Sequence, residues 1–216
     1  MVFKDRLEAG KKLATALEKL PETKGVVVVS LLRGGAILGS VISKKFGFKH
    51  LPLVVTKIPA PFNPELALGA FCFGTVYLEP NIINSLDLDK KIIDEQVLIA
   101  KKKFNDYLKR FSIKEAGFWQ IKNQATIVVD DGIATGATIK AAILYLQKLN
   151  PRKIVLAVPI APNSFNLGQI KIDKIVILQH PTNFSAVSQF YESFPPVEDK
   201  EVRELINFQV PSTNNH

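Results

Sequence analysis

The stretch "IVVDDGIATGAT", residues 127–138, joins an apolar run to a polar loop that contains glycine and threonine. The apolar residues predict a buried strand. Two adjacent aspartates follow, although neighbouring carboxylates repel each other, and two glycines then provide no side chain to pack. Because the packing of a core does not favour these residues, we expect a ligand to account for them.

Asp130 and Asp131 end the predicted strand, and the following residues turn the chain into a helix. Glycines allow successive backbone N–H groups to point into one concavity, and a helix N-terminus carries partial positive charge. With the hydroxyls of Thr135 and Thr138, this loop suits a terminal phosphate. The predicted phosphate-binding loop consists of Gly132, Ile133, Ala134, Thr135, Gly136, Ala137 and Thr138. The two carboxylates only accept hydrogen bonds, which suits a diol, a magnesium ion or both. A phosphorylated ribose combines these features.

Three other interpretations of the stretch explain less. A helix N-cap accounts for one aspartate or threonine, but not for the second aspartate or the glycines. A Walker P-loop has a lysine after its second glycine, and none follows here. The ligands of an EF-hand alternate along a longer loop. We therefore retain the phosphorylated ribose as the expected ligand.

Apolar runs elsewhere in the chain predict further strands, separated by helices. Most of these runs lack polar alternation, which suits parallel strands covered on both faces. Strands are expected at residues 26–32, 51–57, 71–78, 125–131, 153–161 and 174–179, and helices up to residue 20, before residue 45, over about 88–111 and over 135–149. This alternation favours an α/β fold with a mostly parallel sheet flanked by helices and joined by right-handed crossovers.

Polar stretches stand at the expected carboxyl ends of several strands. In such a sheet ligands bind at that edge. "RGG" at residues 33–35 and "TKI" at residues 56–58 lie there, as the two aspartates do. The stretch "IPAPFNPELALGA", residues 58–70, contains three prolines and little periodicity, so it is predicted to be an irregular, mobile loop. We therefore expect the site at this edge of the sheet.

Length and composition indicate a single domain over residues 1–216. The 47% of hydrophobic residues is enough for a sizeable core. The one cysteine, Cys72, excludes a disulfide within the chain and suits a reducing compartment. The N-terminus is typical of an amphipathic helix rather than a signal peptide, and no apolar run approaches the roughly 20 residues of a membrane span. We expect a cytoplasmic protein without a membrane partner.

The net charge of +8 arises from 28 Lys and Arg against 20 Asp and Glu. It indicates either nucleic acid or a polyanionic small molecule as a partner. Three consecutive lysines, Lys101–Lys103, point in different directions on a helix, so they are interpreted as a solvated face.

The quoted stretch resembles the phosphoribosyl pyrophosphate (PRPP) binding motif of the type I phosphoribosyltransferases, without a gap over residues 126–138. "LLRGGAILG" resembles the pyrophosphate loop of that family, and "VVTKIPAPFNPELALGA" resembles its mobile loop, which opens with a lysine. With "FKDRLEAGKKLA", "AVPIAP" and "FSAVSQFYESF", these stretches resemble a subgroup of unassigned base specificity. The resemblance covers most of the chain and implies the type I fold with a small hood.

The resemblance implies a transfer in which a nitrogen nucleophile, a nucleobase or an amine, displaces pyrophosphate from the anomeric carbon of PRPP with Mg²⁺ as cofactor. Asp130 and Asp131 would hold the ribose hydroxyls and contribute to a magnesium site. The residues expected to contact pyrophosphate are Arg33, Gly34, Gly35 and Lys57. The residues expected to be catalytic are Asp130, Asp131, Lys57 and Arg33. The loop over about residues 59–70 would close over the site and exclude water.

The acceptor is left open by the resemblance. A hood formed by about residues 179–195 and the C-terminal tail is expected to cover it, with Phe184 or Tyr191 stacking on a base. In the type I enzymes for hypoxanthine and guanine an aspartate precedes the "TG" of the loop, where this chain has Ala134, so we expect a different acceptor. Glu65 or His180 would be needed as a substitute acid or base.

We also expect a homodimer. The alternative function is a non-catalytic, PRPP-binding regulator of RNA or DNA, which the positive charge allows. Lys57 and the long loop favour the enzyme, because a regulator needs no lid to exclude water.

Overall fold

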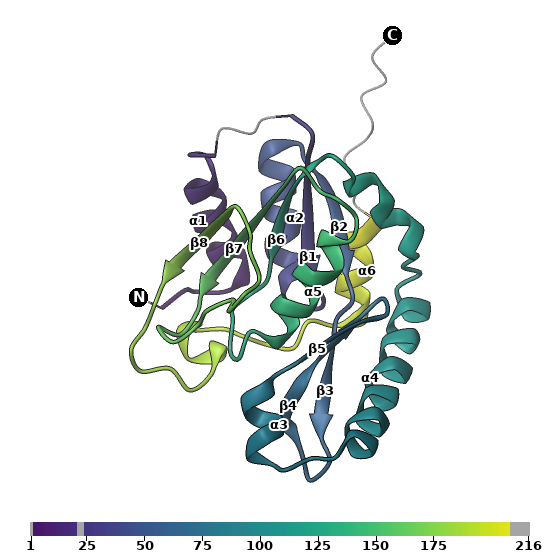
Figure 1. Cartoon of the computed structure of the whole chain (residues 1–216). Helices are drawn as coiled ribbons and strands as arrows, with labels where there is room; N and C mark the ends of the chain where they lie inside the picture. Colours follow the sequence, from purple (N-terminus) through teal and green to yellow (C-terminus); the bar gives the residue numbers. More distant parts are fainter. Residues whose placement is uncertain (1, 21–23, 208–216) are drawn as a thin grey trace.

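The computed structural model describes residues 2–20 and 24–207, and a five-stranded sheet lies at its centre (Figure 1). The strands are β1 (Val26–Leu31), β2 (Lys49–Leu53), β6 (Ala125–Val129), β7 (Lys153–Ile160) and β8 (Lys174–Gln179), in the order β2-β1-β6-β7-β8. All neighbouring strands are parallel. The unbroken apolar runs of β1 and β6 are buried along their whole length. The predicted α/β fold with a mostly parallel sheet is confirmed.

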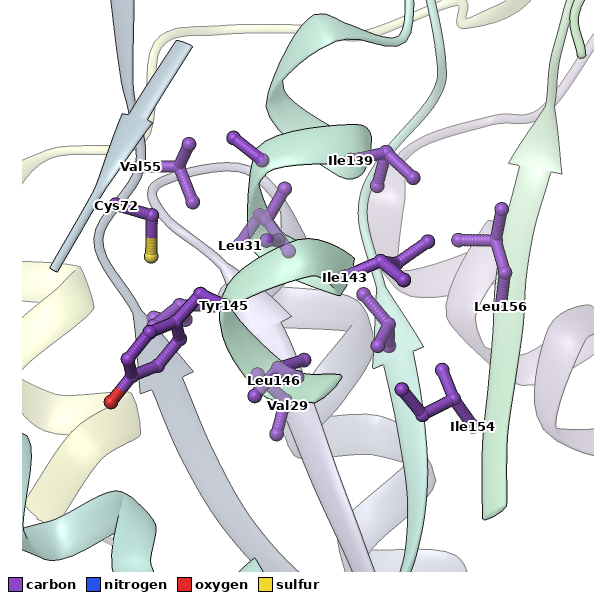
Figure 2. Close-up of a cluster of buried hydrophobic side chains, with 14 of the residues drawn as sticks. Val29, Leu31, Val55, Cys72, Ile139, Ile143, Tyr145, Leu146, Ile154 and Leu156 are labelled. Carbon is purple, nitrogen blue, oxygen red and sulfur yellow. The ribbon is translucent and has the colours of Figure 1, made fainter. Parts of the chain in front are cut away.

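Helices cover both faces of this sheet. α1 (Arg6–Leu17) and α2 (Gly35–Phe46) contribute to the core on one face, and α5 (Ala137–Gln147) packs on the other. Figure 2 shows Ile143 and Leu146 of α5 with Val29 of β1 and Leu156 of β7 in one buried cluster. α6 (Asp199–Asn207) lies against α2. Because β1 and β6 are adjacent and parallel, the loops that follow them emerge side by side.

A second, antiparallel sheet consists of β3 (Thr56–Ala60), β4 (Asn63–Cys72) and β5 (Thr75–Leu78). α3 (Pro80–Ser85) and the long α4 (Lys90–Arg110) follow it, and α4 packs against β3 and β4. Phe104 of α4 meets Phe71 of β4 edge to face, with ring centroids 5.1 Å apart. This unit extends from the main sheet in Figure 1 and forms one side of the opening described below.

Two expectations for this region are wrong. Residues 51–57 form no single strand, because β2 ends at Leu53 in the main sheet and β3 begins at Thr56 in the second sheet. The stretch 58–70 is no irregular loop: it forms most of the β3–β4 hairpin. The pairing shifts register on both sides of Pro59. Such an irregularity accommodates a residue that cannot donate a ladder hydrogen bond.

The expected strand at residues 71–78 is also divided. Phe73 and Gly74 have positive φ angles of 38° and 75° and turn the chain between β4 and β5. By contrast, the helix predicted over 88–111 agrees with α4 to within two residues. Two short 3₁₀ helices, η1 (Glu115–Ile121) and η2 (Val187–Phe190), complete the elements. Trp119 of η1 is exposed.

The N-terminal residues 3 and 4 pair with the segment 190–193, which precedes α6. The N–H of Phe3 donates to the carbonyl of Phe190, and the N–H of Glu192 donates to the carbonyl of Phe3, both at 2.8 Å. The N–H of Ser193 donates to the carbonyl of Lys4 at 2.9 Å. Within residues 2–20 and 24–207, no helix combines the length and apolar character needed to cross a membrane.

Candidate functional site

A cleft of about 610 Å³ opens at the carboxyl ends of β1 and β6. Its walls come from the loop after β1, strand β3 with the two residues before it, helix α4, the loop after β6 and the segment 187–194. The second sheet and α4 therefore face the two conspicuous loops across one opening. This is the edge at which the sequence predicted the site, and the cleft contains both Asp130 and Asp131.

The aspartate pair is held by groups from distant parts of the sequence. Asp131 Oδ2 accepts a hydrogen bond from Arg6 Nε at 2.7 Å, and these side chains are only 15% and 8% exposed. The hydroxyl of Tyr191 donates to the carbonyl oxygen of Asp131 at 2.6 Å. The N–H of Asp131 donates to Asp130 Oδ1 at 2.9 Å. The carboxylates are therefore fixed before any ligand arrives.

Burial shapes the charge of this pair. Burial and the neighbouring Asp131 raise the pKa of Asp130 well above its ordinary value. Burial also raises the pKa of Asp131, while the guanidinium of Arg6 acts in the opposite direction. Two carboxylates so close together favour a cationic or hydrogen-bond-donating partner, such as a metal ion or a sugar hydroxyl.

The glycines of "RGG" allow the loop after β1 to approach the aspartates. A Cβ atom on Gly34 would lie 1.8 Å from Asp131 Oδ2, and a Cβ atom on Gly35 would lie 2.8 Å from the carbonyl oxygen of Val129. Neither separation is compatible with a side chain unless the backbone moves. The loops after β1 and β6 are thus in direct contact, whereas the sequence indicated only that both lie at the carboxyl ends of strands.

The loop after β6 has the shape expected of a phosphate cradle, with one exception. Gly132, Ala134, Thr135, Gly136 and Thr138 all line the cleft. Gly136 has a positive φ of 86° and precedes α5, whose first N–H groups have no partner within the helix. These N–H groups point out of the start of α5, where a bound anion is favoured.

Ile133 is the exception. Its N–H donates to the carbonyl of Ile160 at 2.9 Å, and its side chain is buried in the core. Its predicted part in the phosphate-binding loop is therefore wrong, because its only amide donor is already used. Ala137 is likewise buried, which leaves only its backbone at the start of α5.

Cationic side chains line the same cleft as the aspartates. Arg33 and Lys57 line it, as predicted, and so does Lys103 of α4. Lys101–Lys103 are all exposed, as the interpretation of a solvated face predicted, and α4 places Lys103 at the edge of the opening. Arg33 forms an exposed ion pair with Asp199 of α6 at 3.2 Å, and Arg110 pairs with the same carboxylate at 3.1 Å.

The predicted stacking residues are not the ones that face the cleft. Tyr191 is buried, with the ring of Phe194 centred 4.7 Å from its own and that of Phe3 at 5.5 Å. Phe184 stacks on Phe190 at 5.6 Å. From the region 179–195, Val187 and Phe194 line the cleft instead. Tyr191 therefore has a structural role here, and its hydroxyl is engaged by Asp131.

The sequence also offered His180 and Glu65 as candidate acids or bases. His180 is exposed after β8 and is not among the residues that line the cleft. The side chain of Glu65 and the tail residues 208–216 lie outside what the structure describes. Neither His180 nor Glu65 is therefore placed as a substitute acid or base.

The side chains of the cleft suit a magnesium ion only together with oxygen atoms of a bound substrate. Within the described part of the chain, no group of three or more His, Cys, Asp or Glu side chains gathers as a metal site. Asp130 and Asp131 supply carboxylate oxygens in the cleft. Mg²⁺ is commonly bound in this way, through one or two carboxylates together with substrate phosphates.

Sequence analysis missed Arg6, Lys103, Val187 and Phe194. Arg6 lies within "FKDRLEAGKKLA", one of the stretches on which the resemblance rests, so a signal was present without a role attached to it. Val187 and Phe194 likewise lie within "FSAVSQFYESF", again without a role attached to them. Lys103 carried no such signal, because only the tertiary structure decides which face of α4 borders the cleft.

Comparison with known proteins supports the resemblance. A family model described as the phosphoribosyl transferase domain matches residues 85–194. Two Mycobacterium tuberculosis proteins, MT0597 and Rv0571c, are each 36% identical over 205 residues, and their names assign them provisionally to the phosphoribosyl transferases. The match spans 93% of this chain but only 45% of those relatives. The crystal structure of TT1426 from Thermus thermophilus is similar, with 30% identity, a TM-score of 0.73, and coverage of 95% of this chain and 98% of that one.

Proposed function

The chain belongs to the phosphoribosyltransferase family, and on this basis we propose that it transfers the phosphoribosyl group of PRPP to a nitrogen nucleophile. In this reaction the bond between the anomeric carbon and pyrophosphate breaks and a carbon–nitrogen bond forms. The nitrogen loses a proton, and pyrophosphate leaves. The observation that carries the proposal is the aspartate pair, which lines one cleft together with a helix-start anion site and the cationic side chains of Arg33 and Lys57.

Each part of PRPP has a counterpart in the cleft. The amides at the start of α5, with Thr135 and Thr138, suit the 5-phosphate. The carboxylates of Asp130 and Asp131 suit the ribose hydroxyls, which donate hydrogen bonds. Arg33, Lys57 and the loop at Gly34 suit the pyrophosphate. Holding all three parts at once fixes the anomeric carbon, and such positioning is a large part of catalysis of this kind.

Mg²⁺ supplies charge neutralisation for the departing pyrophosphate when it is bound. Asp130 and Asp131 are the residues that would hold it together with the substrate. Lys57 and Arg33 stabilise negative charge at the same side of the cleft. Arg33 would exchange its exposed pairing with Asp199 for the ligand, at little cost because an exposed ion pair contributes only about 0–1 kcal/mol.

The β3–β4 hairpin is the element best placed to close over the reacting atoms. Lys57 and Pro59 of β3 line the cleft, and Phe62 at the hairpin tip is 93% exposed. Closure would stabilise such an exposed apolar tip by burying it. The mobile loop predicted from the sequence is therefore proposed as a moving hairpin.

Binding of PRPP with Mg²⁺ is the first expected result. At 100 times its dissociation constant, PRPP should stabilise the protein by about 2.7 kcal/mol, because a ligand that binds only the folded state favours it by mass action. Calorimetry and thermal unfolding measure this effect, with removal of Mg²⁺ by a chelator as the control. Amide exchange across residues 58–70 should slow in the same complex. Absence of PRPP binding in the presence of Mg²⁺ would contradict the proposed function.

The second expected result concerns the choice of acceptor. Ala134 lines the cleft, and the resemblance gives its position to an aspartate in the enzymes for hypoxanthine and guanine; a methyl group cannot transfer a proton. General acid–base assistance is typically worth ~10²–10⁴-fold in rate. We therefore expect hypoxanthine and guanine to be poor acceptors, at rates lower by about that factor than ordinary turnover. A pyrimidine or an amine is the expected acceptor.

This expectation is measured as pyrophosphate release from PRPP and Mg²⁺ with a panel of purines, pyrimidines and amines. Turnover with hypoxanthine at ordinary enzyme rates, on the order of 1–10³ s⁻¹, would refute the exclusion of purines. The homodimer, the single-domain organisation with its hood, and the cytoplasmic location stay predictions from the sequence.

A further inference from the structure

We propose that Arg6 is a positioning residue, which sets the orientation of the Asp131 carboxylate for the ribose of the substrate. The inference rests on the proposed function, because it concerns the same site. Arg6 lies in the first turn of α1, 125 residues before Asp131 in the chain. It is not among the residues that line the cleft, so it acts through Asp131 and not by direct contact with a ligand.

Arg6 is itself fixed by three contacts in different directions. Its Nε donates to Asp131 Oδ2 at 2.7 Å, and its Nη1 donates to the carbonyl of Pro195 at 2.7 Å. The guanidinium lies over the ring of Phe194, with Cζ 3.6 Å from the ring centroid. Because a guanidinium is rigid and planar, satisfying these contacts together leaves it one orientation.

This arrangement in turn leaves Asp131 one orientation. Oδ2 lies between Arg6 Nε and the backbone of Gly34, so close to the latter that a Cβ atom there would be 1.8 Å away. A carboxylate confined on that side cannot rotate without breaking the ion pair or moving the loop. Asp131 nevertheless lines the cleft, and its carboxyl group lies beside that of Asp130. The ribose hydroxyls would therefore meet a preset acceptor.

The backbone around Arg6 explains how this support is held. Asp5 caps α1 by accepting from the N–H of Glu8 at 2.8 Å, and residues 3 and 4 pair with residues 190–193. The same C-terminal segment carries Tyr191, whose hydroxyl donates to the carbonyl of Asp131. The N-terminal and C-terminal segments thus converge on a single residue of the loop after β6, although neither belongs to the main sheet.

A purely structural ion pair and a positioning residue predict different binding behaviour. If Arg6 only stabilises the fold, its loss should affect all ligands of the cleft alike, or none of them. If it positions Asp131, its loss should weaken a ligand that contains ribose and spare a ligand that does not. Inorganic pyrophosphate without Mg²⁺ is the matched probe, because its proposed contacts are then Arg33, Lys57 and the loop at Gly34, with no metal ion held by Asp131.

The test compares Arg6→Met, Arg6→Lys and wild type, with Lys12→Met as control. Lys12 is a cation on the same helix that pairs with Glu8 away from the cleft. Calorimetry measures the dissociation constant of PRPP with Mg²⁺ and that of pyrophosphate in the presence of a chelator. Arg6→Met should weaken PRPP about 10- to 100-fold, as expected for loss of an oriented hydrogen bond to a charged group, with pyrophosphate unchanged within about twofold. Arg6→Lys should fall between, because an ammonium cannot make all three contacts. Lys12→Met should match wild type with both ligands.

Added guanidinium ion provides a second measurement. In Arg6→Ala, low concentrations of guanidinium chloride should restore part of the PRPP affinity, and sodium chloride at the same concentration should not. If Arg6→Met and Arg6→Ala fail to fold, Arg6→Lys decides the matter. Equal loss of both ligands in Arg6→Lys, or wild-type affinity for PRPP, would overturn the inference. If the wild type itself binds no PRPP, the proposed function fails instead.

Discussion

The Asp131→Asn variant should bind PRPP with Mg²⁺ at least about 100-fold more weakly than wild type. An amide keeps the size of the carboxylate but removes its charge and replaces one acceptor oxygen with a donor. Hydrogen bonds to a charged group contribute about 1.5–3 kcal/mol each, so losing two of them is enough for this effect. Calorimetric titration with PRPP measures it directly.

Asp131→Asn should also lower the stability of the protein, which the loss of a ligand contact alone would not do. Arg6 would keep its buried position while losing its charge partner, and breaking a buried pair in this way costs about 3–5 kcal/mol of folding free energy. We therefore expect a lower unfolding temperature as well as weaker binding. Asp173→Asn is the matched control, because that carboxylate accepts from the N–H of Ile154 at the opposite end of β7. Equal PRPP affinity in Asp131→Asn and wild type would remove Asp131 from the site.

Gly34→Ala should have an effect of similar size by a different route. The added methyl group would lie 1.8 Å from Asp131 Oδ2 and 2.5 Å from its Cγ, so the loop or the carboxylate must move by roughly an ångström or more. A misplacement of about 1 Å in a catalytic site can cost ~10²-fold. We expect PRPP turnover and affinity to fall by about that factor, while the sheet beneath remains folded.

The control for Gly34→Ala is Gly117→Ala in η1. A Cβ atom at Gly117 meets nothing within 4 Å, and its φ is not positive, so the same chemical change should be neutral there. Steady-state kinetics and thermal unfolding of the two variants make the comparison. Full activity of Gly34→Ala would show that the two loops tolerate separation. The close approach between "RGG" and the aspartates would then have no functional meaning.

The parallel sheet could be predicted because its information is local. An apolar run such as residues 26–31 is buried on both faces, and that burial appears in the sequence as the absence of alternation. The loop after β6 was predictable for the same reason. Gly136 and the residues around it determine the local backbone conformation and the start of the helix that follows. The extent of α4 was predicted as well, and its start is fixed locally by an N-cap, where Asp89 accepts from the N–H of Ile92 at 2.8 Å.

The β3–β4 hairpin could not be predicted because its stability comes from elsewhere. Its three prolines argue against a strand by local propensity. In the structure, the register shifts beside Pro59, and α4 covers β3 and β4 with residues such as Ala100 and Phe104. Packing against a helix from a later part of the chain outweighs local propensity, because propensity differences amount to only about 1 kcal/mol per residue.

The sequence by itself determined the alternation of strands and helices that builds the parallel sheet and the identity of the loop that bears Asp130 and Asp131. Both depend on residues within a few positions of one another, whose spacing directly reflects burial and backbone conformation. The tertiary structure alone decided which groups surround those aspartates. Arg6 reaches Asp131 across 125 residues, Gly34 borders its carboxylate, and Lys103 faces the cleft. These contacts arise where separate elements pack against each other. They leave no local pattern in the sequence, because each residue would fit its own helix, strand or loop equally well without the contact.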